Sequence, residues 1–367
     1  MIAMSGLGAE PPELRRAMLE RAQQVIESGW YVLGNEVASF ENSWAAACGQ
    51  TYGIGVGNGM DAIEIILRAL DLGPGDEVIT TPMTAFATIL AILRAGATPV
   101  LADIDLKTGL LSLPSAERCI GTKTRALLLV HLYGQIDAMD DWCALCDQYG
   151  ISLVEDCAQA HAASWHGRAA GSFGVAGAYS FYPTKNLGCL GDGGMIVTAD
   201  PHLAERARRL RNYGQSQRYQ HMEIGLNSRL DELQAALLCE RLKWLPAFTA
   251  RRRVIATAYR RGIRNPLVKP LATLPDPMAQ VHHQFVVTCK QRNVLQAWLT
   301  ECGVETLIHY PIPIHLQEPC IGILHDPLGL PNAEHHAATC LSLPCHPQLT
   351  DLEVLKVVSA INAFEAS

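Results

Sequence analysis

The sequence has no uninterrupted apolar run near the ~20 residues that a membrane-spanning helix requires. Its first residues, which include Glu10 and Glu13, also lack the apolar core of a secretory signal. Charge is scarce as well, because 18% of the 367 residues are charged and the net formal charge is −7. A basic face that would bind nucleic acid is therefore not expected. We expect a cytoplasmic protein with no nucleic-acid partner and no membrane partner.

Metal-binding spacings are equally scarce. The 12 cysteines are scattered singly, apart from Cys143 and Cys146, which form one Cys-x-x-Cys pair in a segment that reads as a helix. No second pair follows at zinc spacing, and the 13 histidines show no His-Glu-x-x-His pattern. We therefore expect reduced thiols and no metal site.

Hydrophobic residues are plentiful, at 49%, which is enough for a large core in a chain of this length. Between residues 52 and 198, short apolar runs alternate with segments of helical periodicity. Strands are predicted at 53–57, 77–80, 98–102, 125–130, 151–154, 176–181 and 195–198, and helices at 61–70, 86–94 and 139–149. This alternation is typical of an α/β fold with a mostly parallel sheet covered on both faces.

The pattern changes after residue 200. Long helices are predicted at 203–211 and 229–264, the second interrupted at Pro246, and a strand at 284–288 and a helix at 294–302 follow. Another helix is expected at 14–28. We therefore predict an N-terminal arm with a large domain at residues 1–245 and a smaller C-terminal α+β domain at residues 246–367.

Ligands of parallel sheets bind beyond the carboxyl ends of the strands, so chemistry is expected where apolar runs end. The run Gly-Asn-Gly-Met-Asp at 57–61 stands at a strand end and a helix start, where free backbone N–H groups favour a phosphate. A capped glycine turn without a ligand is an equally common reading. The run is neither a Walker loop nor Gly-x-Gly-x-x-Gly, which argues against nucleoside triphosphates and dinucleotides.

Two further strand ends carry ionisable groups. Glu155 and Asp156 end an apolar run, where one of them either caps a turn or meets a buried cationic partner such as a protonated pyridine nitrogen. Lys185 follows another run in a glycine-rich stretch whose nearest opposite charge is Asp192. A partly desolvated lysine has a lowered pKa and attacks carbonyls, although lysines outside helices are usually surface residues.

A fourth feature is the segment 226–236, where Asn227 or Ser228 reads most simply as a helix N-cap. Taken together, the phosphate cradle, the acid for a ring nitrogen and the lysine nucleophile are the three requirements of pyridoxal 5′-phosphate. Their occurrence in one chain predicts a pyridoxal-phosphate enzyme in which Lys185 holds the cofactor as a Schiff base.

The chain resembles the DegT/DnrJ/EryC1/StrS family of pyridoxal-phosphate sugar aminotransferases from about residue 29 to near its C-terminus. The motifs that carry the resemblance are GPGDEVI (73–79), GATPV (96–100), VHLYGQ (130–135), EDCAQAH (155–161), SFYPTKNLG (180–188), GDGG (191–194), LNSRLDELQAA (226–236), HYPIPIH (309–315) and SLPCHP (342–347). So many motifs in order are specific for the family.

The resemblance implies the aspartate-aminotransferase-like fold (fold type I) and a homodimer with shared active sites. Lys185 would form the Schiff base, Asp156 would pair with the pyridine nitrogen, and Gln159 would approach the phenolic oxygen of the ring. The remaining residues carried over by position are Ser180, Gly59 and Met60 at the phosphate, Asn227 at the phosphate of the other subunit, and Arg229, His309 and Tyr310 as substrate contacts.

The chain departs from the family pattern at two positions. The family often has Thr where this chain has Met60, so one hydroxyl contact to the phosphate is lost and backbone amides remain. The family also tends to read Thr-aromatic-x-Ala-Thr over the cofactor ring, and the run at 83–88 departs from that pattern. Phe86 is our candidate for stacking on the pyridine.

The resemblance implies transfer of an amino group from L-glutamate to a keto sugar that is nucleotide-linked and similar to a dTDP-3-keto-6-deoxyhexose. The alternatives are a 4-keto sugar nucleotide, a keto-cyclitol, or a regulatory protein that binds the cofactor without turnover. A dehydratase branch of the family has His in place of the Schiff-base lysine, and Lys185 argues against that branch.

Overall fold

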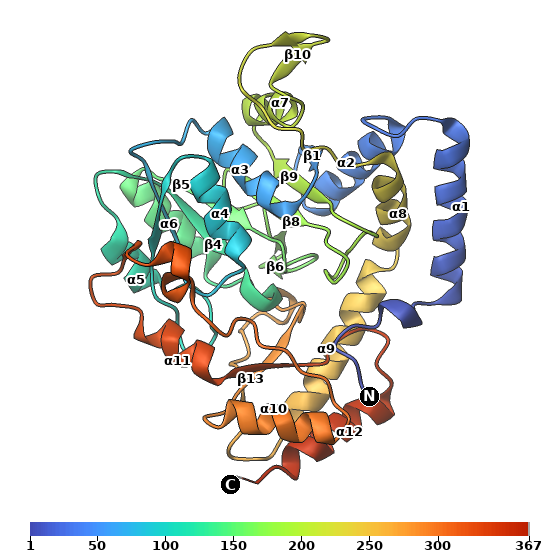
Figure 1. Ribbon diagram of the computed structural model, residues 1–367, viewed down its shortest axis with the longest axis vertical. Helices are drawn as coiled ribbons and strands as arrows, with labels where there is room; N and C mark the ends of the chain where they lie inside the picture. Colours follow the sequence, from blue (N-terminus) through green and yellow to red (C-terminus); the bar gives the residue numbers. More distant parts are fainter. Residues whose placement is uncertain (366–367) are drawn as a thin grey trace.

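The computed structural model describes residues 1–365 and is built around an eight-stranded sheet (Figure 1). The strand order is β1-β9-β8-β5-β4-β2-β3-β14. The antiparallel strand β9 pairs with both β1 and β8, and the other pairings in this sheet are parallel within residues 1–365. The strands are β1 (Tyr52–Val56), β2 (Glu77–Thr80), β3 (Thr98–Leu101), β4 (Thr124–Val130), β5 (Ser152–Asp156), β8 (Ala176–Ser180), β9 (Gly194–Thr198) and β14 (Leu324–His325).

Helices cover both faces of this sheet because its buried strands are apolar on both sides. In β5, Val154 packs in one apolar cluster with helices α3, α4 and α7, whereas Leu153 packs in the opposite cluster with α2, α6 and α8. The bounds of these helices are α2 (Asn35–Ala47), α3 (Gly59–Ala69), α4 (Phe86–Arg94), α6 (Met139–Tyr149), α7 (Pro201–Leu210) and α8 (Glu232–Leu242). The predicted mostly parallel α/β architecture is confirmed.

A second, three-stranded antiparallel sheet lies in the C-terminal part of the chain, in the order β12-β13-β15. It shares an apolar cluster with helices α9, α10 and α12, and Ile2 from the N-terminus joins that cluster. The elements are β12 (Lys269–Pro270), β13 (Phe285–Thr288), β15 (Cys340–Leu343), α9 (Leu245–Gly262), α10 (Arg292–Glu301) and α12 (Asp351–Asn362). The domain division at residue 245 stays a prediction. Strand β14 lies in the predicted C-terminal domain but pairs with β3 of the large sheet.

Several smaller elements complete the fold. Helix α1 packs on α8 through Leu14, Met18 and Leu237, and α11 covers the cluster that α3 and α4 share. In Figure 1 the β10–β11 hairpin projects from the body of the molecule beyond α7. The bounds are α1 (Pro12–Ser28), α5 (Leu113–Cys119), α11 (Pro331–Thr339), β6 (Ser164–Trp165), β7 (Arg168–Ala169), β10 (Gln215–Gln217), β11 (Gln220–His221), η1 (Leu7–Ala9), η2 (Leu132–Gly134), η3 (Pro277–Ala279), η4 (Ile314–Leu316) and η5 (Glu318–Cys320). No helix within residues 1–365 is long and apolar enough to cross a membrane.

One local prediction was wrong. The N-cap expected at Asn227 or Ser228 does not form, because α8 begins at Glu232 after Asp231. The Ser228 hydroxyl instead accepts a hydrogen bond from the Gly57 N–H at 2.9 Å, which ties this segment to the end of β1. Helices α2, α5, α11 and α12 were not predicted, although a Thr350–Glu353 capping box marks the start of α12.

Candidate active site

The last residue of β5, Asp156, is a buried carboxylate with two hydrogen-bond donors. The Thr88 hydroxyl donates to Oδ2 at 2.9 Å, and the Ala158 N–H donates to Oδ1 at 3.1 Å. Burial raises the pKa of Asp156, whereas these two bonds and nearby Lys185 lower it. Within residues 1–365 no cationic nitrogen lies at ion-pair distance from Asp156. A protonated ring nitrogen would supply the missing cation.

Thr88 is itself supported by a second hydroxyl. The hydroxyl oxygens of Thr84 and Thr88 are 2.8 Å apart. Because Thr88 gives its proton to Asp156, the proton between the two threonines must come from Thr84. The resulting chain of hydroxyls favours the charged form of Asp156.

Lys185 lies just beyond the end of β8, in a short turn in which its N–H donates to the Tyr182 carbonyl at 2.9 Å. Burial lowers the pKa of the Lys185 amine to about 8, and attraction to Asp156 opposes that shift. An amine with such a pKa is partly uncharged near neutral pH and can attack a carbonyl. The structure thus brings Lys185 and Asp156 together, as the sequence predicted.

Gln159 follows β5 and has a fixed side-chain orientation. Its Oε1 accepts the backbone N–H of Tyr133 at 2.6 Å, and its Nε2 donates to the Tyr310 hydroxyl at 3.3 Å. Tyr310 therefore reaches the strand-end site from the C-terminal part of the chain. Burial and the charge of Asp156 raise its pKa to about 12, so the phenol stays protonated at neutral pH.

The segment predicted to bind a phosphate lies where α3 begins beside the end of β8. A Cβ on Gly59 would lie 2.7 Å from the Cβ of Ser180, so the close approach of these two elements needs glycine. The first N–H groups of α3, from Gly59 and Met60, precede the hydrogen-bond ladder of the helix. The Met60 side chain packs against the apolar core. The geometry fits a phosphate between the helix start and Ser180.

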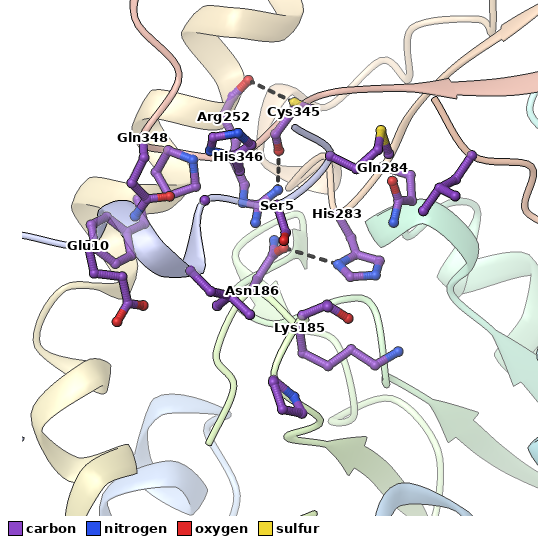
Figure 2. A pocket seen from close by; sticks show the side chains of 18 of the residues that line it. Ser5, Glu10, Lys185, Asn186, Arg252, His283, Gln284, Cys345, His346 and Gln348 are labelled. Atoms are coloured by element: carbon purple, nitrogen blue, oxygen red, sulfur yellow. Dashed lines mark hydrogen bonds between the residues drawn. The ribbon is translucent and has the colours of Figure 1, made fainter. Parts of the chain in front are cut away.

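A cavity of about 210 Å³ adjoins this site (Figure 2). Lys185 lies at one end and Arg252 at the other, with Asn186 and His283 between them. Asn186 Oδ1 and His283 Nδ1 are 3.2 Å apart. His309 also lines this cavity, and burial together with the charge of Lys185 lowers its pKa to about 4.

Three predicted residues make no hydrogen bond or ion pair with Lys185 in the described part of the chain. Asn227 is exposed, and Arg229 donates to Asn212 at 3.1 Å and lies over the Tyr213 ring. Phe86, the first residue of α4, is partly exposed at 37%. Its stacking role stays a prediction, as do the roles of Asn227 and Arg229.

Sequence reasoning gave no role to Thr88, Tyr133 or His283, all of which are buried beside the predicted residues. Thr88 and Tyr133 lie in the runs 83–88 and 130–135, but their hydroxyls contact residues that are distant in sequence, and the runs themselves do not reveal such contacts. No local signal marks His283, because its place beside Asn186 depends on packing between distant segments.

The fold and the site define an aspartate-aminotransferase-like protein, with a lysine and an aspartate at adjacent strand ends of a mostly parallel sheet. The chain belongs to the DegT/DnrJ/EryC1/StrS aminotransferase family, whose model matches residues 12–362. Members of this family depend on pyridoxal phosphate. The family assignment made from the sequence motifs is confirmed.

Named relatives are similar over nearly their whole length. The dTDP-3-amino-3,4,6-trideoxy-α-D-glucose transaminase of Streptomyces venezuelae is 44% identical, and the match covers 98% of this chain and 94% of the relative. The dTDP-3-amino-3,6-dideoxy-α-D-galactopyranose transaminase of Aneurinibacillus thermoaerophilus is 46% identical, with coverages of 96% and 95%. A crystal structure of DesV from S. venezuelae in complex with a ketimine intermediate has a TM-score of 0.95 and 43% identity, with coverages of 98% and 97%.

Proposed function

We propose that this aminotransferase moves an amino group from L-glutamate to a nucleotide-linked keto sugar similar to a dTDP-3-keto-6-deoxyhexose. The observation that carries the proposal is the buried amine of Lys185, whose pKa is lowered to about 8, near a carboxylate that lacks a cation. The sugar class is supported by the two relatives described above, both named as transaminases of dTDP-3-amino sugars.

Each site residue has a definite task in this proposal. Lys185 binds the carbonyl of pyridoxal phosphate and then carries the proton that moves during transfer. Asp156 holds a proton on the ring nitrogen, and Gln159 donates to the phenolic oxygen. Ser180 and the first N–H groups of α3 hold the phosphate. When bound, the cofactor supplies an electron sink for the substrate carbon that loses its proton.

We also propose a homodimer with shared active sites. Large apolar side chains are exposed in three separate stretches near residues 30–32, 182–190 and 213–224, including Trp30 at 63%, Leu190 at 61% and Ile224 at 88%. Such side chains are costly to leave in water, and a second copy of the chain would cover them. Asn227 lies close to the third stretch and would reach the phosphate bound by the partner subunit. Analytical ultracentrifugation that found only monomers would contradict this arrangement.

Two other assignments follow from the residues. His309 and Tyr310 are proposed substrate contacts, because they lie beside Lys185 and Gln159. We place the protein in the cytoplasm, because its 12 cysteines are free thiols, as is usual in a reducing compartment.

The first experiment is a visible spectrum of the purified protein before and after L-glutamate is added. Loss of the yellow band of the Lys185-bound cofactor, with appearance of the pyridoxamine form, would support the donor. Addition of dTDP-linked 3-keto and 4-keto sugars, and of a keto-cyclitol, should then restore the yellow band with the correct acceptor. A band that ignores glutamate would favour either another donor or the regulatory, non-catalytic alternative.

A further inference from the structure

The turn η2, which follows β4, holds a tyrosine that contacts both the segment after β5 and the segment around His309. Tyr133 is buried, and its backbone lies in the left-handed region with φ 63°. Its N–H donates to Gln159 Oε1 at 2.6 Å, and its hydroxyl donates to the carbonyl oxygen of His309. One residue therefore binds the segment after β5 and the segment that carries Tyr310.

The direction of these hydrogen bonds can be deduced. A carbonyl only accepts, so the Tyr133 phenol gives its single proton to His309. The Nε2 of His336, 2.9 Å from the same phenol oxygen, must then be the protonated nitrogen of its ring. Burial lowers the pKa of His336 to about 4, so this ring is neutral at pH 7. Its Nδ1 is buried with no hydrogen-bond partner in the described part of the chain, which is consistent with that tautomer.

The same reasoning fixes Gln159. A backbone N–H only donates, so Oε1 of Gln159 must face Tyr133 and Nε2 must face the Tyr310 hydroxyl. The contacts close into a ring that runs from the Tyr133 N–H to Gln159, on to Tyr310, through the peptide to His309, and back to the Tyr133 hydroxyl. A ring of this kind loses its positional constraint when any one contact opens.

We propose that Tyr133 is a positioning residue that sets the Gln159 amide, which faces the cofactor, against Tyr310, which faces the substrate. This inference rests on the function proposed above. It assigns Tyr133 no contact with the reacting atoms and makes His336 the support for its hydroxyl.

The test uses the cofactor-loaded protein and the variants Tyr133→Phe, Tyr310→Phe and the double variant. Tyr133→Phe removes one oxygen atom and keeps the N–H that binds Gln159. A displaced Gln159 donates less well to the ring oxygen, so the pH midpoint of the visible band should rise by ~0.5 unit or more. The kcat/KM of amino transfer should fall about tenfold, because small misplacements of positioned groups are costly.

The double variant decides between positioning and a separate role. Either single variant opens the same ring. Adding Tyr133→Phe to Tyr310→Phe should therefore leave the pH midpoint where Tyr310→Phe alone sets it, and should change kcat/KM by less than about twofold. Tyr149→Phe is the matched control, since Tyr149 is exposed and its hydroxyl binds Glu117 on the surface. It should behave as the wild type.

Two results would overturn the inference. Tyr133→Phe could match the wild type in both measurements, or its effects could multiply in full with those of Tyr310→Phe, as they would for a purely structural tyrosine. Failure of the proposed function looks different, because the wild type itself would then show no visible band or no response to L-glutamate.

Discussion

Two carboxylates, Glu155 and Asp156, are adjacent at the end of β5 and point to opposite faces of the large sheet. Glu155 accepts four hydrogen bonds, from the ring of His131 and from three backbone N–H groups at residues 171, 173 and 174. Asp156 accepts two, from Thr88 and Ala158. A carboxylate offers about four acceptor sites, so Glu155 is saturated and Asp156 is not.

This contrast indicates which of the two carboxylates is available to a ligand. Glu155 ties β4 and the loop before β8 to β5 and has no capacity left. For that reason we assign no metal to the group His131, Glu155 and Cys157, although their ligand atoms lie within 4.8 Å of one another. The unsaturated carboxylate is the one near the Lys185 amine.

The largest effect on activity is expected at Lys185, whose amine lies near Asp156, the unsaturated carboxylate. Lys185→Ala should lower amino transfer by ~10⁴-fold or more, because both the attachment of the cofactor and the proton carrier are lost. The thermal midpoint of the apo-protein should not fall, since the Lys185 amine makes no hydrogen bond or ion pair within residues 1–365 and is costly to bury as a cation. Single-turnover assays with L-glutamate measure the loss, and persistent activity would refute the assignment.

Asp156→Asn tests the unsaturated carboxylate with a side chain of the same shape. Amino transfer should fall by ~10²–10³-fold, because the ring nitrogen loses the charge that keeps it protonated. The free energy of unfolding should change little, since burial opposes the charge of Asp156 in the empty protein. Urea unfolding and kcat measured on the same preparation separate the two quantities. A fall in kcat that is accompanied by a comparable loss of unfolding free energy would make Asp156 a structural residue.

Glu155→Gln should give the opposite pattern. The new amide would turn an NH₂ group toward backbone N–H donors, and about 2–4 kcal/mol of unfolding free energy should be lost. Once folded and loaded, the protein should retain most of its kcat, because Glu155 contacts neither Lys185 nor Gln159 in the described residues. Urea denaturation checks the stability. A large drop in kcat at unchanged stability would place Glu155 in the chemistry.

Thr88 supplies one of the two bonds to Asp156, so its hydroxyl should matter more than its shape. Thr88→Val keeps the volume and removes the donor, and about a tenfold loss of kcat/KM is expected. Thr88→Ser retains the hydroxyl and should restore most of the activity. Similar losses in both variants would show that packing, and not the hydrogen bond, matters at this position.

Thr88 also shows how much the sequence could predict, because the run that contains it was recognised but its hydrogen bond to Asp156 was not. Lys185, Asp156 and Gln159 were found because motifs at strand ends are local, and the parallel sheet brings those ends to one edge. The strand bounds were right to within one or two residues for the same reason. The contacts of Tyr310, Tyr133 and His283 were not found, since they depend on how the C-terminal segment packs against the large sheet.

The smallest expected effect is a shift in the pH dependence of cofactor attachment. With the pKa of Lys185 lowered to about 8, the reactive uncharged amine makes up about a tenth of the population at pH 7 and most of it at pH 9. The rate at which the apo-protein binds pyridoxal phosphate covalently should therefore rise with pH and level off above about pH 8. Each rate is divided by that of a simple amine, which corrects for titration of the cofactor itself.

The two carboxylate variants should affect the midpoint of this pH profile differently. Asp156→Asn removes the attraction that raises the pKa of Lys185, so the midpoint should move lower, whereas Glu155→Gln should leave the midpoint in place. A midpoint near 10.5, the ordinary pKa of lysine, would mean that Lys185 is solvated and that the contrast between the two carboxylates does not extend to the amine.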